Sequence, residues 1–314
     1  MSNNRVFFYI NSHTHLLDLA GAVQTFNEAV NYGIHYDLRF ISDQPSQKSS
    51  ANLGFNHLEL FSNVVIEPTD IVVIAGFSVS YLPKGNTLLF DWLQQAAERK
   101  ATICSVCTGA FMLAESGILD RKTCTTHWDF TERLQKAYPN IEVLTNRLFV
   151  KNDNIYTSAG VSTGIDLALF ILEERHGAKF AYQIARELVV YIRRDGFDPQ
   201  DSIYLQYRQH INNSVHEVQD WMIHHLEHKI SIEQLAERVH TSPRNLTRLF
   251  KSTTGITIGT YLEKLRVEKA VQLLKENTKI ETIAHACSFQ STNQLRSLLK
   301  KHLHVLPSEL MNLS

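Results

Sequence analysis

Three side chains in the first half of the chain could together perform nucleophilic chemistry. Cys107 follows the apolar run 101–106 and precedes a helical pattern over 108–116, so we expect it at a sharp strand-to-helix corner. There the N-terminal end of the helix favours a thiolate. His127 follows 20 residues later, and Asp18 lies where the first loop enters a helix. A cysteine, a histidine and an acid can act as nucleophile, base and orienting group, which allows a cysteine-dependent hydrolase.

The same cysteines allow other interpretations. Cys104 and Cys107 have the spacing of a redox pair, and Cys107 alone could act as a redox sensor that peroxide oxidises. Cys104-x-x-Cys107 and Cys124-x-x-His127 together have the spacing of zinc ligands. A strand-to-helix corner directs Cys104 and Cys107 in different directions, so we expect no metal and no cofactor. In the remaining interpretation, which we prefer, Cys107 occupies this corner without catalysing a reaction.

A second group of side chains could recognise nucleic acid. No acidic residue lies between Ser242 and Lys251, and the helical segment there presents hydrogen-bond donors on its outward face. Arg can grip guanine with two hydrogen bonds and Asn can grip adenine, whereas Lys and Thr suit phosphates. The donors are Arg244, Asn245, Thr247, Arg248 and Lys251. Their types and spacing predict a helix that enters the major groove of double-stranded DNA.

The elements that would hold these donors occur twice. Four apolar residues with spacing i, i+3, i+4, i+7 begin at Ile232, and the pattern returns 48 residues later at Ile280. That spacing is one buried face of a short helix. Ser242 and Pro243 provide a capping hydroxyl and a proline at the first position of the next helix. The repetition predicts two helix-turn-helix units joined by a helix over 258–275.

The preceding part of the chain has a different pattern, in which short apolar runs alternate with helical ones. The run 71–75 is wholly apolar, as is typical of a strand buried on both faces. We expect strands at 6–10, 36–41, 71–75, 101–106 and 155–158, and helices at 16–30, 86–100, 164–175, 178–194 and 215–227. Alternation of this kind predicts an α/β sandwich with a largely parallel sheet.

The domain organisation follows from these two patterns. A stretch with Gly, Pro and acidic residues after residue 195 breaks the preceding helix. We therefore expect an α/β domain over 1–195, a linker over 196–214 and an all-α DNA-binding domain over 215–314. Residues 211–314 hold 13 basic and 10 acidic side chains, and the rest of the chain holds 18 and 22. A mildly basic region behind an acidic one fits local contact with DNA.

The composition argues against several classes of protein. With 314 residues, 44% hydrophobic and 20% charged, the chain has the composition of a globular protein of two domains. No apolar run reaches the roughly 18 residues that a membrane span needs. The first residues lack a signal-peptide pattern, and four cysteines do not make a disulfide framework. We therefore expect a cytoplasmic protein.

The C-terminal pattern resembles a known family. Residues 231–310, beginning SIEQLAERVHTSPRNLTRLF, are similar to the DNA-binding domain of the AraC/XylS family of bacterial transcription factors. The resemblance implies that two units enter successive major-groove segments of an operator. Carried over by position, Arg244, Thr247 and Arg248 would contact DNA from the first unit. The corresponding DNA-contacting residues of the second unit are Thr292, Asn293, Arg296, Ser297 and Lys300.

The second unit departs from the family pattern. Ser288 stands where Gly is usual, Leu295 and Leu299 replace aromatic residues, and His304 replaces a turn Gly, although Pro307 is retained. Apolar residues replace apolar residues, so the fold should persist. The departures imply less base-specific contact from this unit.

Residues 5–194 resemble the PfpI/class I glutamine-amidotransferase-like superfamily, and within it the sensor half of GlxA-type AraC regulators. The resemblance rests on CTGAFMLAESGILDRKTCTTHW, YTSAGVSTGIDLALFILEERHG and IARELVVYIRR. It implies a flavodoxin-like, amidotransferase-like fold, a sensor and dimerisation role for residues 1–195, and an effector pocket that Cys107 lines. In hydrolytic or glyoxalase-like relatives the positions of Cys107, His127 and Asp18 are catalytic, which is the alternative that the resemblance implies. The implied pocket residues are Asp18, Gly76, Cys107, Thr108 and His127. Gly76-Phe77 stands where the family commonly has Gly-Gly, which could alter the floor of the pocket.

The two resemblances together imply a function. They suggest a sequence-specific, homodimeric transcription regulator and not an enzyme, with double-stranded DNA as its partner. A small-molecule effector, for which nitrogen-containing metabolites are the suggested class, would control it. We class the regulator as an activator, although the sequence does not distinguish activation from repression.

Overall fold

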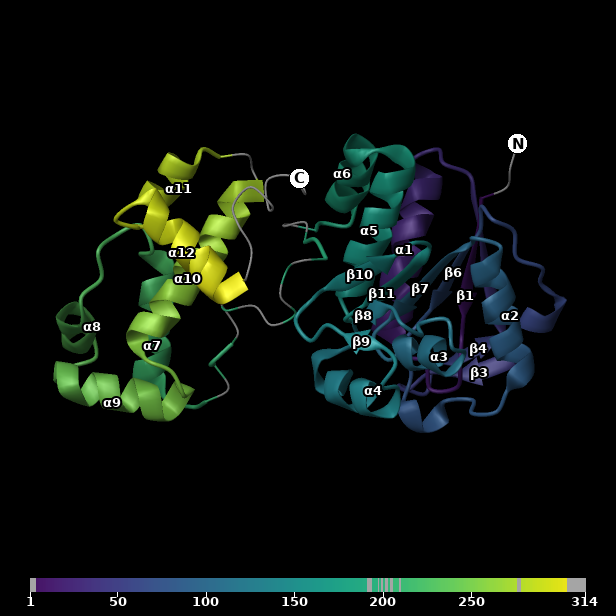
Figure 1. Cartoon of the computed structure of the whole chain (residues 1–314), viewed down its shortest axis with the longest axis horizontal. Helices are drawn as coiled ribbons and strands as arrows, with labels where there is room; N and C mark the ends of the chain where they lie inside the picture. The colour runs from purple at the N-terminus through teal and green to yellow at the C-terminus, as the bar shows by residue number, and fades with distance from the viewer. Residues whose placement is uncertain are drawn as a thin grey trace. The chain divides into compact units, whose positions relative to one another are not determined.

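The computed structural model describes residues 4–190, 194–196, 198, 200, 203, 206–208, 210–275 and 278–303. The chain divides into two compact units, Met1–Gln200 and Asp201–Ser314. Figure 1 shows sheet and helices in the first unit and helices alone in the second. Within the described part of the chain, no helix has the length and apolar character needed to cross a membrane.

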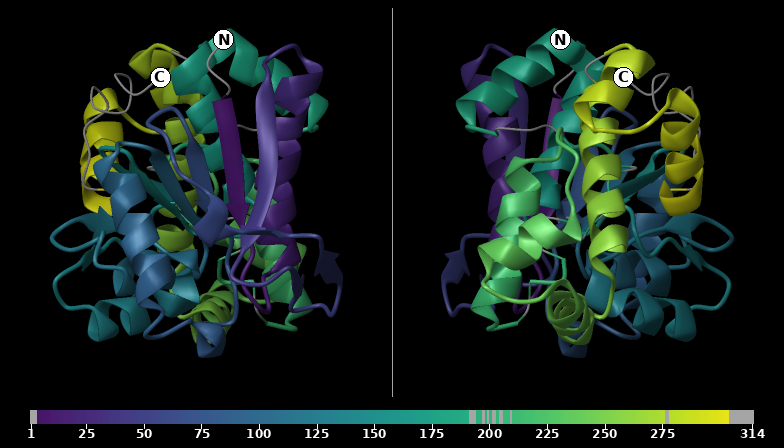
Figure 2. Two further views of the ribbon diagram at one scale, coloured as in Figure 1. Left: turned by 90° about the vertical axis from the view of Figure 1, so that its right-hand side faces the viewer. Right: turned by 90° about the vertical axis from the view of Figure 1, so that its left-hand side faces the viewer.

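A seven-stranded sheet forms the centre of the first unit, in the order β10-β11-β7-β6-β1-β2-β5. The strands are β1 (Asn4–Tyr9), β2 (Tyr36–Ser42), β5 (Glu59–Leu60), β6 (Ile71–Ile74), β7 (Thr102–Val106), β10 (Phe149–Asn152) and β11 (Ile155–Ser158). Every neighbouring pair is parallel except β10 with β11, and β1 and β2 lie side by side in Figure 2. All four residues of β6 are buried, as its unbroken apolar run predicts. The predicted largely parallel α/β sandwich is confirmed.

Helices cover both faces of this sheet. On one face lie α1 (Leu16–Asn31), α5 (Thr163–His176) and α6 (Ala178–Glu187), and on the other α2 (Thr87–Glu98), α3 (Gly109–Glu115) and α4 (Thr131–Ala137). Phe7 and Phe8 belong to opposite cores because side chains alternate along a strand. The remaining short elements are β3 (Ser46–Lys48), β4 (Gly54–Asn56), β8 (Thr123–Cys124), β9 (Glu142–Val143) and the 3-10 turns η1 (Phe61–Asn63), η2 (Val79–Tyr81) and η3 (Trp128–Phe130).

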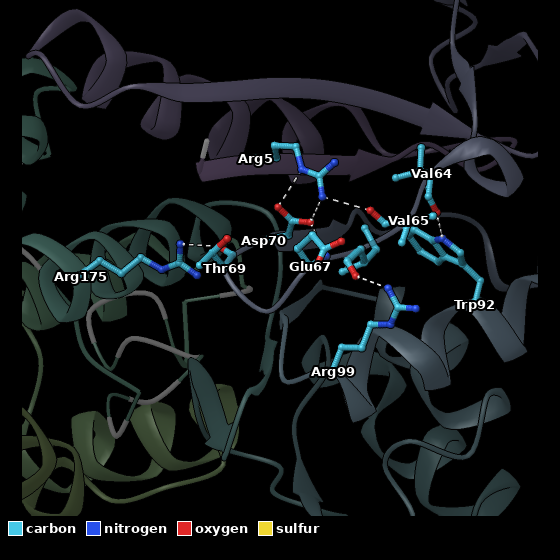
Figure 3. A network of polar contacts seen from close by, with 10 residues as sticks. Arg5, Val64, Val65, Glu67, Thr69, Asp70, Trp92, Arg99 and Arg175 are labelled. Atoms are coloured by element: carbon cyan, nitrogen blue, oxygen red, sulfur yellow. Dashed lines mark hydrogen bonds and ion pairs between the residues drawn. The ribbon is translucent and has the colours of Figure 1, made fainter. Parts of the chain in front are cut away.

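A buried polar network holds the segment that leads into β6 (Figure 3). Asp70 is fully buried and accepts hydrogen bonds from Arg5 Nε at 3.0 Å and Arg5 Nη2 at 2.5 Å. The backbone N–H of Glu67 donates to the same carboxylate at 2.6 Å. Trp92 Nε1 donates to the carbonyl oxygen of Val64 at 2.8 Å. Because a buried carboxylate is costly to leave unpaired, this network fixes where β6 starts beside β1.

The second compact unit of the chain contains two helix-turn-helix units, and one long helix, α10 (Ile258–Lys275), contributes to the cores of both. Its helices are α7 (Asn213–His224), α8 (Ile232–Arg238), α9 (Pro243–Thr254), α10 (Ile258–Lys275), α11 (Ile280–Ala286) and α12 (Thr292–Leu303). Tyr261 and Leu265 of α10 belong to the core of the first helix-turn-helix unit, whereas Ala270 and Leu274 belong to the core of the second. Ser242 caps α9 by accepting from the backbone N–H of Asn245, as its sequence predicts. The predicted all-α domain with two such units is confirmed.

Two predicted helices extend at least three residues beyond the observed C-terminal ends. The helix expected to reach residue 194 ends at Glu187, where Val189 adopts φ of +55°. The backbone N–H of Val190 then bonds back to the carbonyl of Ala185, which closes the helix end. The helix expected to reach residue 227 ends at His224, because the backbone of the next residue, His225, leaves the helical conformation with φ of −129° and ψ of 27°. The expectations for His304 and Pro307 lie outside the described residues.

Candidate effector site and nucleic-acid interface

The first unit gathers the predicted pocket residues at the carboxyl ends of its central strands. Asp18 lies in the first turn of α1, which follows β1, and Gly76 follows β6. Cys107 follows β7 directly, and Gly160 follows β11. The sheet order runs outward in opposite directions from the β1–β6 pair. A crevice at such a reversal is where ligands bind in open α/β sheets.

Cys107 occupies a tight and strained corner. Its φ is +57°, a left-handed conformation that costs energy in a non-glycine residue. Its backbone N–H donates to the carbonyl of Ser158 at 2.9 Å, and its own carbonyl accepts from Thr126 Oγ1 at 2.8 Å. A Cβ atom on Gly160 would lie 2.2 Å from Cys107 Cβ, so glycine is required there. Residues at the end of β11 and after β8 therefore hold the predicted strand-to-helix corner in place.

Asp18 lies beside this corner and is completely buried. Its Oδ1 accepts a hydrogen bond from the backbone N–H of Val161 at 2.5 Å. Its Oδ2 accepts no N–H or hydroxyl donor from the described residues, the Cys107 thiol interacts with the carboxyl, and His15 Nδ1 lies 3.6 Å from Oδ2. A Cβ atom on Gly76 would lie 2.2 Å from this oxygen and 2.8 Å from Cys107 Cβ. The structure thus brings Asp18, Gly76 and Cys107 together around an oxygen with unused acceptor capacity.

The electrostatics of the pair oppose a thiolate. Burial is the larger cause and the neighbouring Asp18 carboxyl the next, and together they raise the pKa of Cys107 to about 12. Burial also raises the pKa of Asp18, against the opposing effects of the Val161 N–H and of His15. The seven-residue helix α3 does not outweigh these effects. The thiol is therefore neutral at pH 7, unlike the thiolate expected from the helix end alone.

The other two predicted pocket residues face neighbouring backbone. Thr108 Oγ1 accepts from the N–H of Phe77 at 2.9 Å and donates to its carbonyl at 2.6 Å, which pins the loop after Gly76. His127 Nδ1 accepts from the backbone N–H of Asp129 at 3.4 Å. Among the described residues, no hydrogen bond joins His127 to Cys107. Accepting at Nδ1 leaves the proton of a neutral imidazole on Nε2.

Three residues that the sequence analysis did not assign to the pocket belong to this arrangement. His15 stands three positions before Asp18, on the same side of the first helical turn, a spacing that could have been noticed. Val161 supplies its N–H from a backbone with φ of +55°, which no local pattern announces for a β-branched residue. Thr126 reaches Cys107 from a loop distant in sequence.

The four cysteines are free and buried. Cys104 lies in the core that α1 and α5 cover, and burial raises its pKa strongly. In the part of the chain that the structure describes, no three His, Cys, Asp or Glu side chains gather closely enough to hold a metal ion.

In the second unit, α9 presents its donors to solvent. Arg244, Asn245, Arg248 and Lys251 are exposed, while Leu246 and Phe250 on the opposite face are fully buried. Thr247 is half-buried, and its hydroxyl donates to the carbonyl of Pro243 at 2.8 Å within the helix. The predicted donors thus form one exposed face, except that the Thr247 hydroxyl already has a partner.

On the corresponding face of α12, two of the predicted DNA-contacting side chains form a hydrogen bond with each other. Asn293, Arg296, Ser297 and Lys300 are exposed and Thr292 is half-buried. Arg296 Nη1 donates to Asn293 Oδ1 at 3.3 Å, so each side chain already uses part of its hydrogen-bonding capacity within the helix. Leu295 and Leu299, which replace the family's aromatics, are fully buried in the core. The apolar replacements therefore retain the fold, as expected.

Known proteins resemble both parts of the chain. Residues 4–174 match the DJ-1/PfpI family, and residues 235–312 match a helix-turn-helix domain. The HTH-type transcriptional regulator CdhR of Pseudomonas aeruginosa is 29% identical over 263 residues, or 82% of this chain and 77% of CdhR. GbdR, an HTH-type regulator of the same species, is 30% identical over 220 residues, or 69% of this chain and 59% of GbdR. The crystal structure of an AraC family regulator from Pseudomonas putida shares the fold, with a TM-score of 0.52 and 18% identity over 59% of this chain and 99% of that one.

Proposed function

Because the chain belongs to the DJ-1/PfpI family and carries a helix-turn-helix domain behind the family domain, we propose that it is a sequence-specific DNA-binding transcription regulator. The observation that carries the proposal is the exposed face of α9, where Arg244, Asn245, Arg248 and Lys251 lie without an intervening acid. Such a face combines groups that read bases with groups that bind phosphates. The regulators CdhR and GbdR, which match most of the chain, support the same function.

The first unit acts in this proposal as the sensor. An effector would bind at the crevice around Asp18, Gly76 and Cys107. The buried Oδ2 of Asp18 can accept a hydrogen bond, which suits an N–H group of a nitrogen-containing metabolite. Two copies of the chain would pair, and effector binding would change which half-sites their DNA-binding domains reach together. We propose that the regulator acts as an activator, at the nucleoid.

The test is an affinity pull-down of sheared genomic DNA, followed by sequencing. Wild type should enrich a shared motif, which Arg248→Ala should lose or blur. Arg186→Ala, which removes an exposed arginine from α6 of the sensor unit, is the matched control and should enrich the same motif as wild type. If wild type enriches no motif, with or without a cell extract of metabolites, the proposed function is wrong.

The alternative function is a cysteine-dependent hydrolase or glyoxalase-like enzyme that uses Cys107, His127 and Asp18. The adjacency of Asp18 and Cys107 favours the enzyme. The raised pKa of the Cys107 thiol weighs against it, and so does the lack, among the described residues, of a hydrogen bond between His127 and Cys107. Turnover that Cys107→Ala abolishes, while DNA binding survives, would support the enzyme.

A further inference from the structure

The chain leaves the first unit directly beside the candidate effector site. Gln200 Nε2 donates to the carbonyl of Thr126 at 2.9 Å and to Thr125 Oγ1 at 3.1 Å. The backbone N–H of Gln200 donates to Asn146 Oδ1 at 3.2 Å, and its side-chain oxygen is buried. Thr126 in turn donates its hydroxyl to the carbonyl of Cys107 at 2.8 Å. Two side chains therefore connect the strained Cys107 corner to the last residue of the first unit.

Further contacts hold the segment just before Gln200. The backbone N–H of Leu148 donates to the carbonyl of Asp198 at 3.1 Å. Arg194 Nη2 lies 2.5 Å from Oδ2 of the buried Asp166, with which it forms an ion pair. The described residues of the segment 194–200, which overlaps the start of the linker expected over 196–214, thus include several positions that pack against the sensor.

The second unit is anchored soon after in the sequence. Ile203 is buried in the core around α7 and α10. Gln219 Nε2 donates to the carbonyl of Tyr207 at 3.0 Å, and the Tyr207 ring packs edge-on against Tyr261 of α10. Only residues 201 and 202 separate Gln200 from Ile203 in the sequence. The last residue held in the first unit and a residue buried in the core of the second are therefore only three positions apart in the sequence.

We propose that Thr126 and Gln200 are positioning residues that transmit the state of the effector site to the DNA-binding unit. The proposal rests on the proposed function, since it names how that site regulates. An effector that contacts Asp18 and Cys107 shifts the population of the strained corner, and the Cys107 carbonyl moves with it. The Thr126 hydroxyl follows, and its backbone carbonyl either keeps or releases Gln200. The DNA-binding unit is then held or freed at its attachment point.

The first experiment tests the hydrogen bonds that hold Gln200 to Thr125 and Thr126, and it needs no DNA. Thr126→Val removes a hydroxyl with little change of shape, and Gln200→Leu removes the amide. Hydrogen exchange in the full chain should accelerate at least about fivefold in peptides that span residues 194–200, the lower end of typical coupling between sites. Gln183→Leu, an exposed change on α6, is the matched control and should leave exchange unchanged. Unchanged exchange in Gln200→Leu, with an unchanged melting temperature, overturns the proposal.

The second experiment tests transmission with a substitution in the site as the probe. Asp18→Asn should alter exchange in residues 194–200 of the wild-type background and have no such effect in the Thr126→Val background. With the genomic fragment recovered by pull-down, Asp18→Asn should change affinity about fivefold or more, and the change should vanish in Thr126→Val. Equal effects of Asp18→Asn in both backgrounds overturn the proposal. If wild type binds no fragment, the proposed function fails, whereas the exchange result still decides the coupling.

Discussion

Replacing Arg248 with alanine should remove base recognition from the first helix-turn-helix unit. Arg248 lies on the exposed face of α9, one turn after Arg244 and one turn before Lys251. At a rise of about 1.5 Å per residue, 244–251 covers roughly 10 Å of helix. That length matches about three base pairs at roughly 3.4 Å each. A single side chain in the middle of this face should therefore determine preference at one or two positions of the motif.

The magnitude follows from the contact that an arginine makes. A bidentate contact to guanine discriminates against other bases by about 1–3 kcal/mol, which is roughly 5- to 150-fold in affinity. Arg248→Ala should lose about this much on the preferred sequence and little on scrambled DNA. Lys251→Ala should instead weaken binding to all sequences and lower the salt slope by about 0.9. Arg296→Ala should cost less, because Arg296 already donates to Asn293 within α12.

The assay is fluorescence anisotropy with the recovered fragment, variants of each base in its motif, and a salt series. All three substitutions lie on exposed surfaces, so melting temperatures should stay near that of wild type. Two results would refute the reasoning. One is an Arg296→Ala loss equal to or larger than that of Arg248→Ala. The other is an Arg248→Ala loss of equal size on all sequences.

Three further predictions concern the first unit. Cys107 should resist iodoacetamide near pH 7 and react only as the pH approaches its raised pKa of about 12; rapid labelling at pH 7 would favour the catalytic alternative. Burial raises the folded pKa of Asp18 above its ordinary 3.8, so folding takes up a proton and the ionised carboxylate costs stability at higher pH. Asp18→Asn should therefore raise the melting temperature at pH 7, and the gain should vanish below pH 3.8; a pH-independent gain would contradict this. Arg5→Met should lower the free energy of unfolding by about 3 kcal/mol in denaturant, near the lower end for a broken buried pair because the arginine side chain is 21% exposed. A loss below about 1 kcal/mol would refute the pairing, and so would the lack of any recovery in the double variant with Asp70→Asn.

The helix-turn-helix elements were predictable because their signals are local. Ser242 and Pro243 mark a helix start, and the i, i+3, i+4, i+7 spacing marks a buried face. The predicted linking helix 258–275 matches α10 in its bounds. By contrast, the end of α6 at Glu187 depends on a valine in a left-handed conformation, for which residue type carries no signal.

The strands of the sensor were also recognisable, but their arrangement was not. An apolar run such as 71–75 shows that a strand is buried without showing which strands flank it. The order β7-β6-β1-β2 brings Asp18, Gly76 and Cys107 together at one edge of the sheet, although 89 positions separate the first from the last. The same packing brings Thr126 against Cys107 and Gln200 against Thr126, which no spacing along the chain indicates.

By itself, the sequence determined that a cysteine stands at a strand-to-helix corner and that an acid-free basic helix follows in the second half of the chain. Only the tertiary structure decided the state of that cysteine. The helix end favours a thiolate, but burial and the Asp18 carboxyl raise the pKa of Cys107 to about 12. Desolvation and neighbouring charge depend on what packs around a group, which is a property of the folded chain and not of its local pattern.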